Sequence, residues 1–328
     1  MNEHNFQMNM LAQRLGHYTE VKANEPMGEH TSMKTGGSAD LFIEPESEAA
    51  LVRCVARISD MGGSYYLLGN GSNVIFRDGG YRGVVVSTLK ALSSDVLISG
   101  NTLKCGAGDS LARVSKAAAV QGLSGMEGLF GIPGTIGGAI LMNAGAYGDE
   151  IADVISEVRV WDLVDSNHIM LSKDDLGFGY RTSVFQKGRM DCGSGPAMTN
   201  KGSAMTEERY LILSATFTLR QGDAKEIENT MTDYQARRTD SQPLTLPSSG
   251  SFFRRPEGHY AAALIDEAGL KGKSVGGAAV SDKHAGFIVN RGGATTSDIL
   301  ALSNDVKQIV YEKFGILLEE EPIFIGED

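Results

Sequence analysis

The segment Leu68–Gly80 reads LGNGSNVIFRDGG and says more about the fold than any other stretch of the chain. Hydrophobic residues lie on both sides of five small, turn-forming residues, Gly69 to Asn73. Hairpin loops have about two to five residues, so the segment could be a simple turn. It could also be a nest, in which successive backbone N–H groups point inward and bind an anion. A Rossmann fingerprint is excluded because the strand-like VIF follows the glycines, and the Gly-Lys-Ser/Thr of a P-loop is absent.

A second glycine-rich segment, GIPGTIGGAILMNAGAYGDE, occupies Gly131–Glu150. It contributes six of the 41 glycines in the chain, with Pro133 fixing one bend. Packing alone seldom requires so many glycines, whereas close approach of the backbone to a ligand does. Two such segments predict a large, extended ligand held by the main chain. A crowded set of turns in a small β/α domain is the alternative.

Composition limits the classes of partner. The chain has 328 residues, enough for two domains, with 30 basic and 41 acidic side chains and a net charge of −11. A field of that sign does not attract nucleic acid or an anionic membrane, so we expect small-molecule partners. No signal-length or membrane-spanning apolar run is present. Cys54, Cys105 and Cys192 match no metal spacing, which indicates a reducing, cytoplasmic setting and no metal site.

Hydrophobic periodicity predicts several helices. An N-terminal helix would carry Phe6, Met10, Leu11 and Leu15 on one side. Later helices are expected at 46–63 (Leu51, Val55 and Ile58 inward), 110–122 (Leu111, Val114 and Ala118 inward), 223–238, 261–269 and 295–315 (Ile299, Leu302, Val306 and Ile309 inward). Strands are expected between them.

Composition shifts near Gln221, where we place a domain boundary. The first domain would span 1–221, with subdomains of about 1–85 and 86–221, and the second 222–318. Residues 319–328 form a C-terminal tail. The polar, aperiodic segment Gly188–Glu208 predicts a surface loop or, alternatively, a lid.

Seven motifs, in order, resemble those of the UDP-N-acetylenolpyruvylglucosamine reductases, the flavoenzymes that complete UDP-N-acetylmuramate for bacterial peptidoglycan. The resemblance covers about Met27 to Glu327 and is closest to the shorter type of this family. The motifs are TSMKTGGSADLFIEP, LLGNGSNVIFRDGG, GIPGTIGGAILMNAGAYGDE, YRTSVFQ, SSGSFFRRPEGH, GLKGKSVGGAAVSDKHAGFIVN and EKFGILLEEEPIFIGE.

The resemblance implies an α+β fold, with an FAD-binding domain of the vanillyl-alcohol-oxidase (PCMH) type followed by an α+β substrate-binding domain. It also implies that the tail returns to the active site. FAD would be non-covalent, because neither glycine segment holds a histidine or cysteine, and NADPH would be the co-substrate. The implied FAD-binding residues are Gly69, Asn70, Gly71, Ser72, Asn73, Gly131, Ile132, Gly134, Thr135, Gly137, Gly138, Asn143, Gly145 and Ala146.

The implied reaction transfers hydride from reduced FAD to C3 of the enolpyruvyl ether and a proton to C2. Arg181 matches the family's active-site arginine, and a guanidinium suits a carboxylate whose charge grows. Ser251 matches the proton donor, its register set by GSFF rather than by the neighbouring Ser248 and Ser249. Glu321 would assist protonation or orient the intermediate, although Pro322 departs from the family pattern.

Tyr180 is expected at the substrate or nicotinamide, and Arg255 at the nucleotide diphosphate. The chain is expected to be a monomer. Two alternatives remain: an FAD oxidase of alcohols or sugars with the same fold, and a flavin- or nucleotide-binding protein without catalysis. Motifs shared only through the fold would end before Gln221, whereas here they continue to the tail, which favours the reductase.

Overall fold

The computed structural model describes residues 3–186 and 209–328. The segment Gly188–Glu208 and Cys192 lie outside the described residues. The helices are α1 (Glu3–Leu15), α2 (Glu48–Asp60), α3 (Leu111–Val120), α4 (Ile136–Met142), α5 (Ile151–Val154), α6 (Ala224–Ser241), α7 (Ala261–Glu267) and α8 (Thr296–Phe314), with short 3₁₀ turns at Met27–His30, Lys173–Leu176 and Val184–Gln186. The strands are β1 (Val21–Pro26), β2 (Ser38–Ile43), β3 (Tyr65–Leu68), β4 (Val74–Phe76), β5 (Tyr81–Ser87), β6 (Leu97–Ser99), β7 (Thr102–Gly106), β8 (Leu123–Ser124), β9 (Gly145–Ala146), β10 (Asp149–Glu150), β11 (Ile155–Asp162), β12 (Asn167–Ser172), β13 (Tyr210–Thr218), β14 (Arg220–Gln221), β15 (Ser274–Val275), β16 (Ala278–Val280), β17 (Ile288–Asn290) and β18 (Ile323–Ile325).

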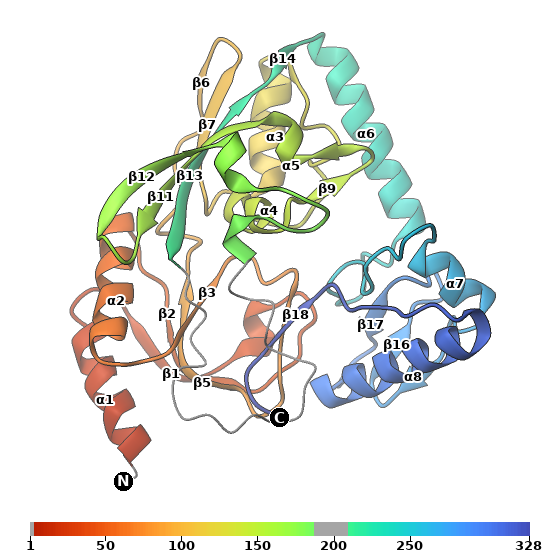
Figure 1. Ribbon diagram of the computed structural model, residues 1–328, viewed down its shortest axis with the longest axis horizontal. Coiled ribbons are helices and arrows are strands. Elements are labelled where there is room, and N and C mark those ends of the chain that lie inside the picture. The colour runs from red at the N-terminus through yellow and green to blue at the C-terminus, as the bar shows by residue number, and fades with distance from the viewer. Residues whose placement is uncertain (1–2, 187–208) are drawn as a thin grey trace.

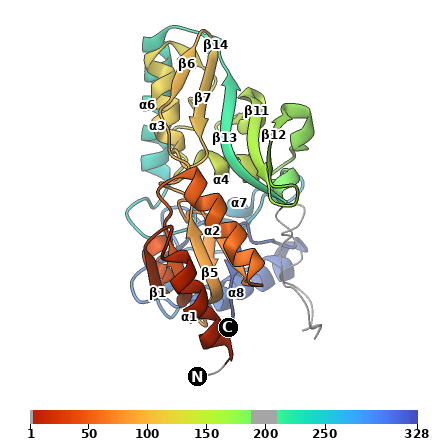
Figure 2. The same cartoon turned by 90° about the vertical axis from the view of Figure 1, so that its left-hand side faces the viewer.

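The N-terminal part is a four-stranded sheet in the order β1-β2-β5-β3, with β2 and β3 parallel to β5. Helices α1 and α2 lie side by side against this sheet (Figures 1 and 2). One core joins them to the sheet: Leu11 and Leu15 of α1 and Val55 of α2 pack with Ile43 and Val84. The predicted inward face of α2 is confirmed, because Leu51, Val55 and Ile58 are all buried.

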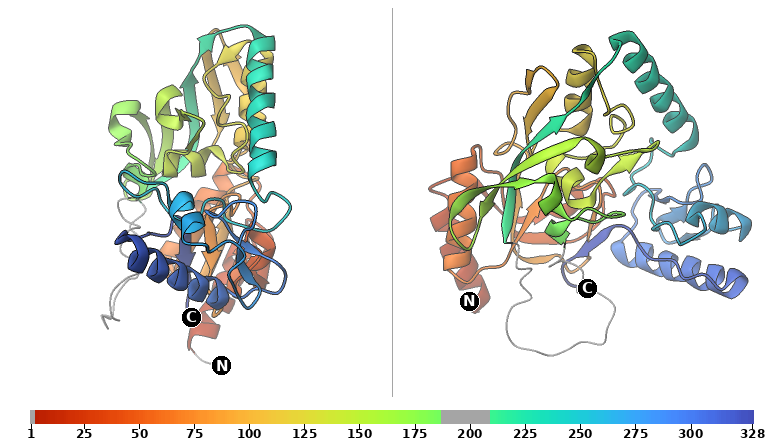
Figure 3. Two further views of the ribbon diagram at one scale, coloured as in Figure 1. Left: turned by 90° about the vertical axis from the view of Figure 1, so that its right-hand side faces the viewer. Right: turned by 45° about the horizontal axis from the view of Figure 1, so that its top comes forward.

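The middle part is an antiparallel sheet in the order β12-β11-β13-β7-β6. Its core includes α3 and α4, with Leu111, Val114 and Ile140 packed against Val158 and Phe217. The long helix α6 leaves this part and runs towards the C-terminal unit (Figures 1 and 3).

The C-terminal unit packs α7 and α8 with the small antiparallel sheet β15-β16-β17. After α8 the chain crosses back to the N-terminal part, where β18 pairs in parallel with β4. Asp78, in the turn after β4, accepts hydrogen bonds from the backbone N–H groups of Thr296 and Ser297 at the start of α8, both at 2.8 Å. These two contacts tie the end of the LGNGSNVIFRDGG segment to the C-terminal unit.

Two details differ from the sequence-based expectation. Phe6 is 60% exposed, and Met8 instead of Phe6 joins Leu11 and Leu15 in the buried face of α1. Helix α4 was not anticipated: within the second glycine segment, Thr135 Oγ1 accepts from the Gly138 N–H and starts a short helix. In the described part of the chain, no helix is long and apolar enough to cross a membrane.

Candidate active site

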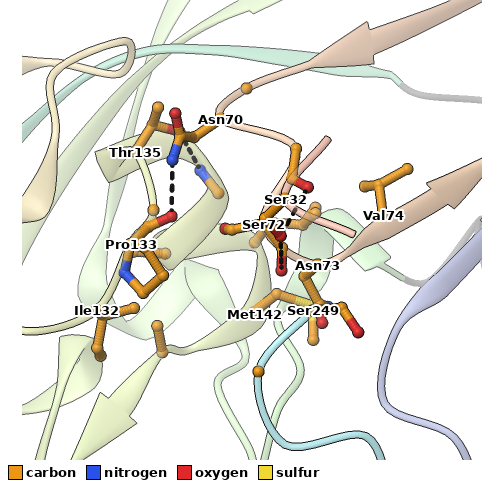
Figure 4. A pocket seen from close by; sticks show the side chains of 18 of the residues that line it. Ser32, Asn70, Ser72, Asn73, Val74, Ile132, Pro133, Thr135, Met142 and Ser249 are labelled. Carbon is orange, nitrogen blue, oxygen red and sulfur yellow. Dashed lines mark hydrogen bonds between the residues drawn. The ribbon is translucent and has the colours of Figure 1, made fainter. Parts of the chain in front are cut away.

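A cavity of about 950 Å³ lies where the three parts meet, and both glycine segments line it. That volume is at the upper end of the roughly 300–1,000 Å³ usual for small-molecule sites and suits an extended ligand. All five residues of the first segment, Gly69–Asn73, lie in its wall between β3 and β4. Figure 4 shows the Asn70 side chain beside Thr135 and Pro133 of the second segment, whereas Ser72 lies apart from them, next to Ser32.

The first segment includes a left-handed glycine and packs closely against neighbouring parts of the chain. Gly71 has φ +61°, and a Cβ there would lie 2.1 Å from the His30 carbonyl oxygen. A Cβ on Gly69 would lie 2.8 Å from Thr135 Oγ1, so a larger residue would push the two glycine segments apart. Asn70 Nδ2 donates to the Pro133 carbonyl at 2.9 Å and fixes their separation. The loop is therefore a shaped wall rather than a free hairpin turn.

The second segment contributes most, but not all, of the residues expected at the cavity. Residues in its wall are Ile132, Gly134, Thr135, Gly137, Gly138, Gly145 and Ala146. Gly131 does not line the cavity and lies against Arg238, whose Cδ would be 3.2 Å from a Cβ at Gly131.

Asn143 also lies outside the lining, and its side chain is occupied elsewhere. It ends α4 in the left-handed conformation, donates to the Gly179 carbonyl at 3.1 Å and accepts from the Ala152 N–H at 3.0 Å. These contacts place Asn143 behind the wall, where it holds the turn that carries Arg181.

Arg181 occupies a tight turn at one end of the cavity. Its φ is +54°, and Gly179 and Thr182 pair across it. Its Nε lies 2.9 Å from Glu321 Oε1, and its Nη2 donates to the Gly145 carbonyl at 3.3 Å. The guanidinium is thus aimed by one carboxylate and one backbone carbonyl, both of which belong to residues of the cavity wall.

The three adjacent glutamates point in different directions. Glu319 is exposed, whereas Glu320 accepts hydrogen bonds from Ser303 and Lys307 of α8. Although burial alone would raise the pKa of Glu320, these hydrogen bonds lower it. Of the three, Glu321 alone lines the cavity; burial raises its pKa, and the charge and hydrogen bond of Arg181 oppose that rise without cancelling it.

Ser251 also lies in the cavity wall. The next residue, Phe252, donates its N–H to the Gly286 carbonyl at 2.8 Å and accepts from the Glu321 N–H at 2.9 Å. These bonds hold Ser251 and Glu321 on adjacent extended segments. Ser248 and Ser249 also line the cavity, and Ser249 Oγ is buried without a hydrogen-bond partner among the described residues.

Tyr180 and Arg255 meet near the turn that carries Arg181 but do not line the cavity. The Arg255 N–H donates to Tyr180 Oη at 3.2 Å, and Arg255 Cζ lies 4.0 Å from the ring centroid of Tyr260. Both side chains are solvent-exposed, which suits contact with a ligand that enters from outside.

Sequence reasoning missed the cavity-lining residues in the last turn of α6 and directly after this helix. Arg238, Gln242 and Leu244 all face the cavity. Burial lowers the pKa of Arg238, and this guanidinium has no carboxylate partner within the described ranges. The adjacent arginines in ARRTDSQP were a usable signal, because a helix that ends in two cations can place one of them inward.

The residues present fit a dinucleotide cofactor. The cavity has backbone-lined walls that a Cβ would fill, an orphaned serine hydroxyl and a partly buried cation. Within residues 3–186 and 209–328, no group of three or more His, Cys, Asp or Glu side chains could hold a metal ion. Fold and site together define a flavoprotein oxidoreductase, and residues 39–170 match the family model of the FAD binding domain.

The second family model that matches is the UDP-N-acetylenolpyruvoylglucosamine reductase C-terminal domain, at residues 242–325. UDP-N-acetylenolpyruvoylglucosamine reductase of Clostridium botulinum (strain Hall) is 43% identical over 94% of this chain and 93% of its own length. That of Caldanaerobacter subterraneus is 42% identical over 93% of each chain. The crystal structure of the Thermus caldophilus enzyme aligns with a TM-score of 0.74 and 32% identity over 94% of this chain and 98% of that one.

The chain therefore belongs to the UDP-N-acetylenolpyruvoylglucosamine reductase family. The predicted fold class, an FAD-binding domain followed by an α+β domain, is confirmed, and so is FAD as the cofactor.

Proposed function

We propose that the protein reduces UDP-N-acetylenolpyruvoylglucosamine to UDP-N-acetylmuramate, with NADPH as the electron donor and non-covalent FAD as the cofactor. The observation that carries this proposal is that the Arg181–Glu321 pair and Ser251 line the same cavity as the two glycine segments. Family membership supports the substrate class, because the relatives are named for that reaction.

FAD would be held by Gly69–Asn73, by the lining residues of the second glycine segment and by the end of α6. When bound, it supplies the hydride that adds to C3 of the enolpyruvyl group. Every other part of the chemistry falls to side chains of this protein, which must bind the substrate carboxylate, stabilise the charge that develops beside it and deliver a proton to C2.

Arg181 would bind the carboxylate and stabilise the growing negative charge. A guanidinium is positively charged and can donate two parallel hydrogen bonds to a carboxylate. Glu321 holds Nε at 2.9 Å and the Gly145 carbonyl holds Nη2 at 3.3 Å, which leaves Nη1 and the second hydrogen of Nη2 to donate to the ligand. Glu321 would therefore orient the arginine and help to move the proton.

Ser251 would donate the proton to C2. A serine hydroxyl is a weak acid, so this role requires a strongly basic carbon in fixed geometry. The backbone hydrogen bonds on either side of Phe252 supply a fixed geometry. Phe252 and Phe253 are buried directly after it and shield one side of the site from water.

Tyr180 and Arg255 would contact the nucleotide part of the substrate. A guanidinium matches a diphosphate in charge and in hydrogen-bond geometry. We further propose the division into residues 1–221, 222–318 and the tail 319–328, in which the tail delivers Glu321 to the site.

The visible absorption spectrum of the purified holoprotein, followed without oxygen, tests the function. Flavin bands should bleach on addition of NADPH and return on addition of UDP-N-acetylenolpyruvoylglucosamine. Bands that bleach but return only with oxygen would identify an oxidase instead. A protein that takes up no FAD would contradict the assignment of the glycine segments.

A further inference from the structure

Two tyrosines from distant parts of the chain stack beside the cavity. Tyr147 lies in the turn between β9 and β10, and Tyr234 lies on α6. Their ring centroids are 4.4 Å apart, with planes inclined by 7°. Tyr147 Oη also donates to the Tyr234 carbonyl at 3.2 Å, so a single side chain makes two contacts with α6.

Tyr147 is an unusual residue for its backbone position. It has φ +57°, and Gly148 after it has φ +95°. A two-residue hairpin turn with both φ values positive favours Asn, Asp or Gly at its first position, and a bulky side chain is disfavoured there. The strained residue of the turn is thus the one whose side chain contacts α6. This indicates that the contact itself has a role.

The turn is directly connected to the proposed reaction site. Gly145 and Ala146, just before Tyr147, line the cavity. The Gly145 carbonyl accepts a hydrogen bond from Arg181 Nη2 at 3.3 Å. A movement of this turn would therefore shift both a wall of the cavity and one of the two groups that aim Arg181.

Helix α6 is a firm support for the turn. Ile227 and Met231, in its first half, pack with Ala119 and Phe130 of the middle part. Tyr234 follows one turn later, and Arg238 in the next turn lines the cavity. The helix lies between the two segments that match family models, residues 39–170 and 242–325.

We propose that the Tyr147–Tyr234 stack is a clasp that fixes the β9–β10 turn over the cavity, so that Tyr147 and Tyr234 are positioning residues for the bound flavin nucleotide and for Arg181. The clasp acts through Gly145 and makes no contact of its own with the reacting atoms. Its effect on Arg181 rests on the proposed function, whereas its effect on cofactor retention does not.

The first measurement is the rate of FAD release from the purified holoprotein, followed by the rise in flavin fluorescence after dilution. Tyr234→Ala should release FAD about 2- to 10-fold faster than wild type, the range that an aromatic pair contributes. Tyr147→Phe keeps the ring but loses the Oη hydrogen bond, so its release rate should lie between those of wild type and Tyr234→Ala. Tyr311→Ala is the matched control, because Tyr311 is 53% exposed on α8 and makes no ring contact in the described part of the chain.

Tyr147→Gly distinguishes the effect of the ring stack from the effect of backbone strain in the turn. Glycine relieves the backbone strain but removes the stack, so this variant should fold at least as well and still release FAD as fast as Tyr234→Ala. If Tyr147→Gly retained FAD like wild type, or if Tyr234→Ala matched Tyr311→Ala, the clasp would be wrong.

Steady-state kinetics with the enolpyruvyl substrate provide the second measurement. Loss of the clasp should lower kcat more than it raises KM, because Arg181 would still bind but at a poorer angle. A merely structural role would lower the melting temperature and leave both FAD release and kcat per bound flavin unchanged. An inactive wild-type holoprotein would contradict the proposed function without affecting the FAD-release result.

Discussion

At the scale of single residues, the site depends on how a few charges are buried and paired. Arg181 and Glu321 are both largely buried, and each would be costly to bury alone. The pairing satisfies the arginine, yet burial still raises the pKa of Glu321. A carboxyl group with a raised pKa in a cavity that a serine also lines is a suitable arrangement for moving a proton.

Replacement of Ser251 tests the proton-donor role. Ser251→Ala should leave the reduction of FAD by NADPH unchanged, because that step needs no proton at C2. Reoxidation by the enolpyruvyl substrate should slow by about 10²- to 10⁴-fold, the usual contribution of a positioned acid. Stopped-flow spectroscopy of each half-reaction measures both. Ser248→Ala is the control, and equal losses in the two half-reactions would contradict the role.

The raised pKa of Glu321 predicts a particular pH dependence of stability. The folded protein binds this proton more tightly than the unfolded chain does. The corresponding stabilisation is present below the ordinary glutamate pKa and is lost as the pH rises through the folded-state pKa. Relative to wild type, Glu321→Gln should therefore gain stability as the pH rises from about 4.

Urea unfolding between pH 4 and pH 8 measures this trend. Glu319→Gln, which removes the same charge from an exposed neighbour, is the control. A stability difference between wild type and Glu321→Gln that stayed constant across the range would show that burial does not govern this carboxyl group.

At the scale of elements, one helix terminus connects the halves of the molecule. Asp78 accepts from two backbone N–H groups at the start of α8 and from Ser297 Oγ at 2.6 Å. Although partial desolvation would raise the pKa of Asp78, these hydrogen bonds lower it. Asp78 of the LGNGSNVIFRDGG segment is therefore an external cap for helix α8 of the C-terminal unit.

Asp78→Ala should destabilise the protein by about 0.5–1.5 kcal/mol, the lower part of the range for a lost cap, because the site is exposed to solvent. The effect should diminish as the pH falls through the lowered folded-state pKa of Asp78, where the charge is lost in wild type also. Thermal unfolding at neutral and acid pH measures it. Asp95→Ala, which alters an exposed loop acid, should be neutral, and equal effects of the two substitutions would contradict the capping role.

At the scale of the whole molecule, the site exists because the tail returns. β18 pairs with β4, and the Ile323 N–H donates to the Asn73 carbonyl at 2.9 Å. Asn73 Nδ2 donates to the Glu321 carbonyl at 3.4 Å. The end of the chain thus connects the first glycine segment to the glutamate that holds Arg181.

A chain that ends after Pro322 keeps Glu321 but loses β18. If Glu321 has its proposed role, turnover should fall about 10- to 100-fold, the penalty for a small displacement of a group that acts on the substrate, while flavin content changes much less. Flavin absorbance measures the flavin content, and an activity assay of the same preparations measures the turnover. A chain that lacks only Asp328 is the control, and normal turnover of the shorter chain would contradict a positioning role for β18.

Much of the fold could be predicted from local patterns. The periodicity of α2, α3 and α8 identified their buried faces, and the glycine signals identified where α8 ends. Local patterns failed at α1, where Phe6 matched the helical period of the apolar residues but is exposed instead of packing in the core. They also failed at α4, because glycines disfavour a helix that Thr135 and the surrounding core nevertheless stabilise.

The sequence by itself determined that the first glycine segment is followed by a strand, that the main chain forms the cavity wall, and to which family the chain belongs. Only the tertiary structure decided that Glu321 pairs with Arg181, that Asn143 lies behind the wall and that Arg238 lines it. The physical reason is separation along the chain. Local periodicity shows which side of an element is apolar, but Arg181 and Glu321 are 140 residues apart, and their meeting depends on how β18 docks on β4.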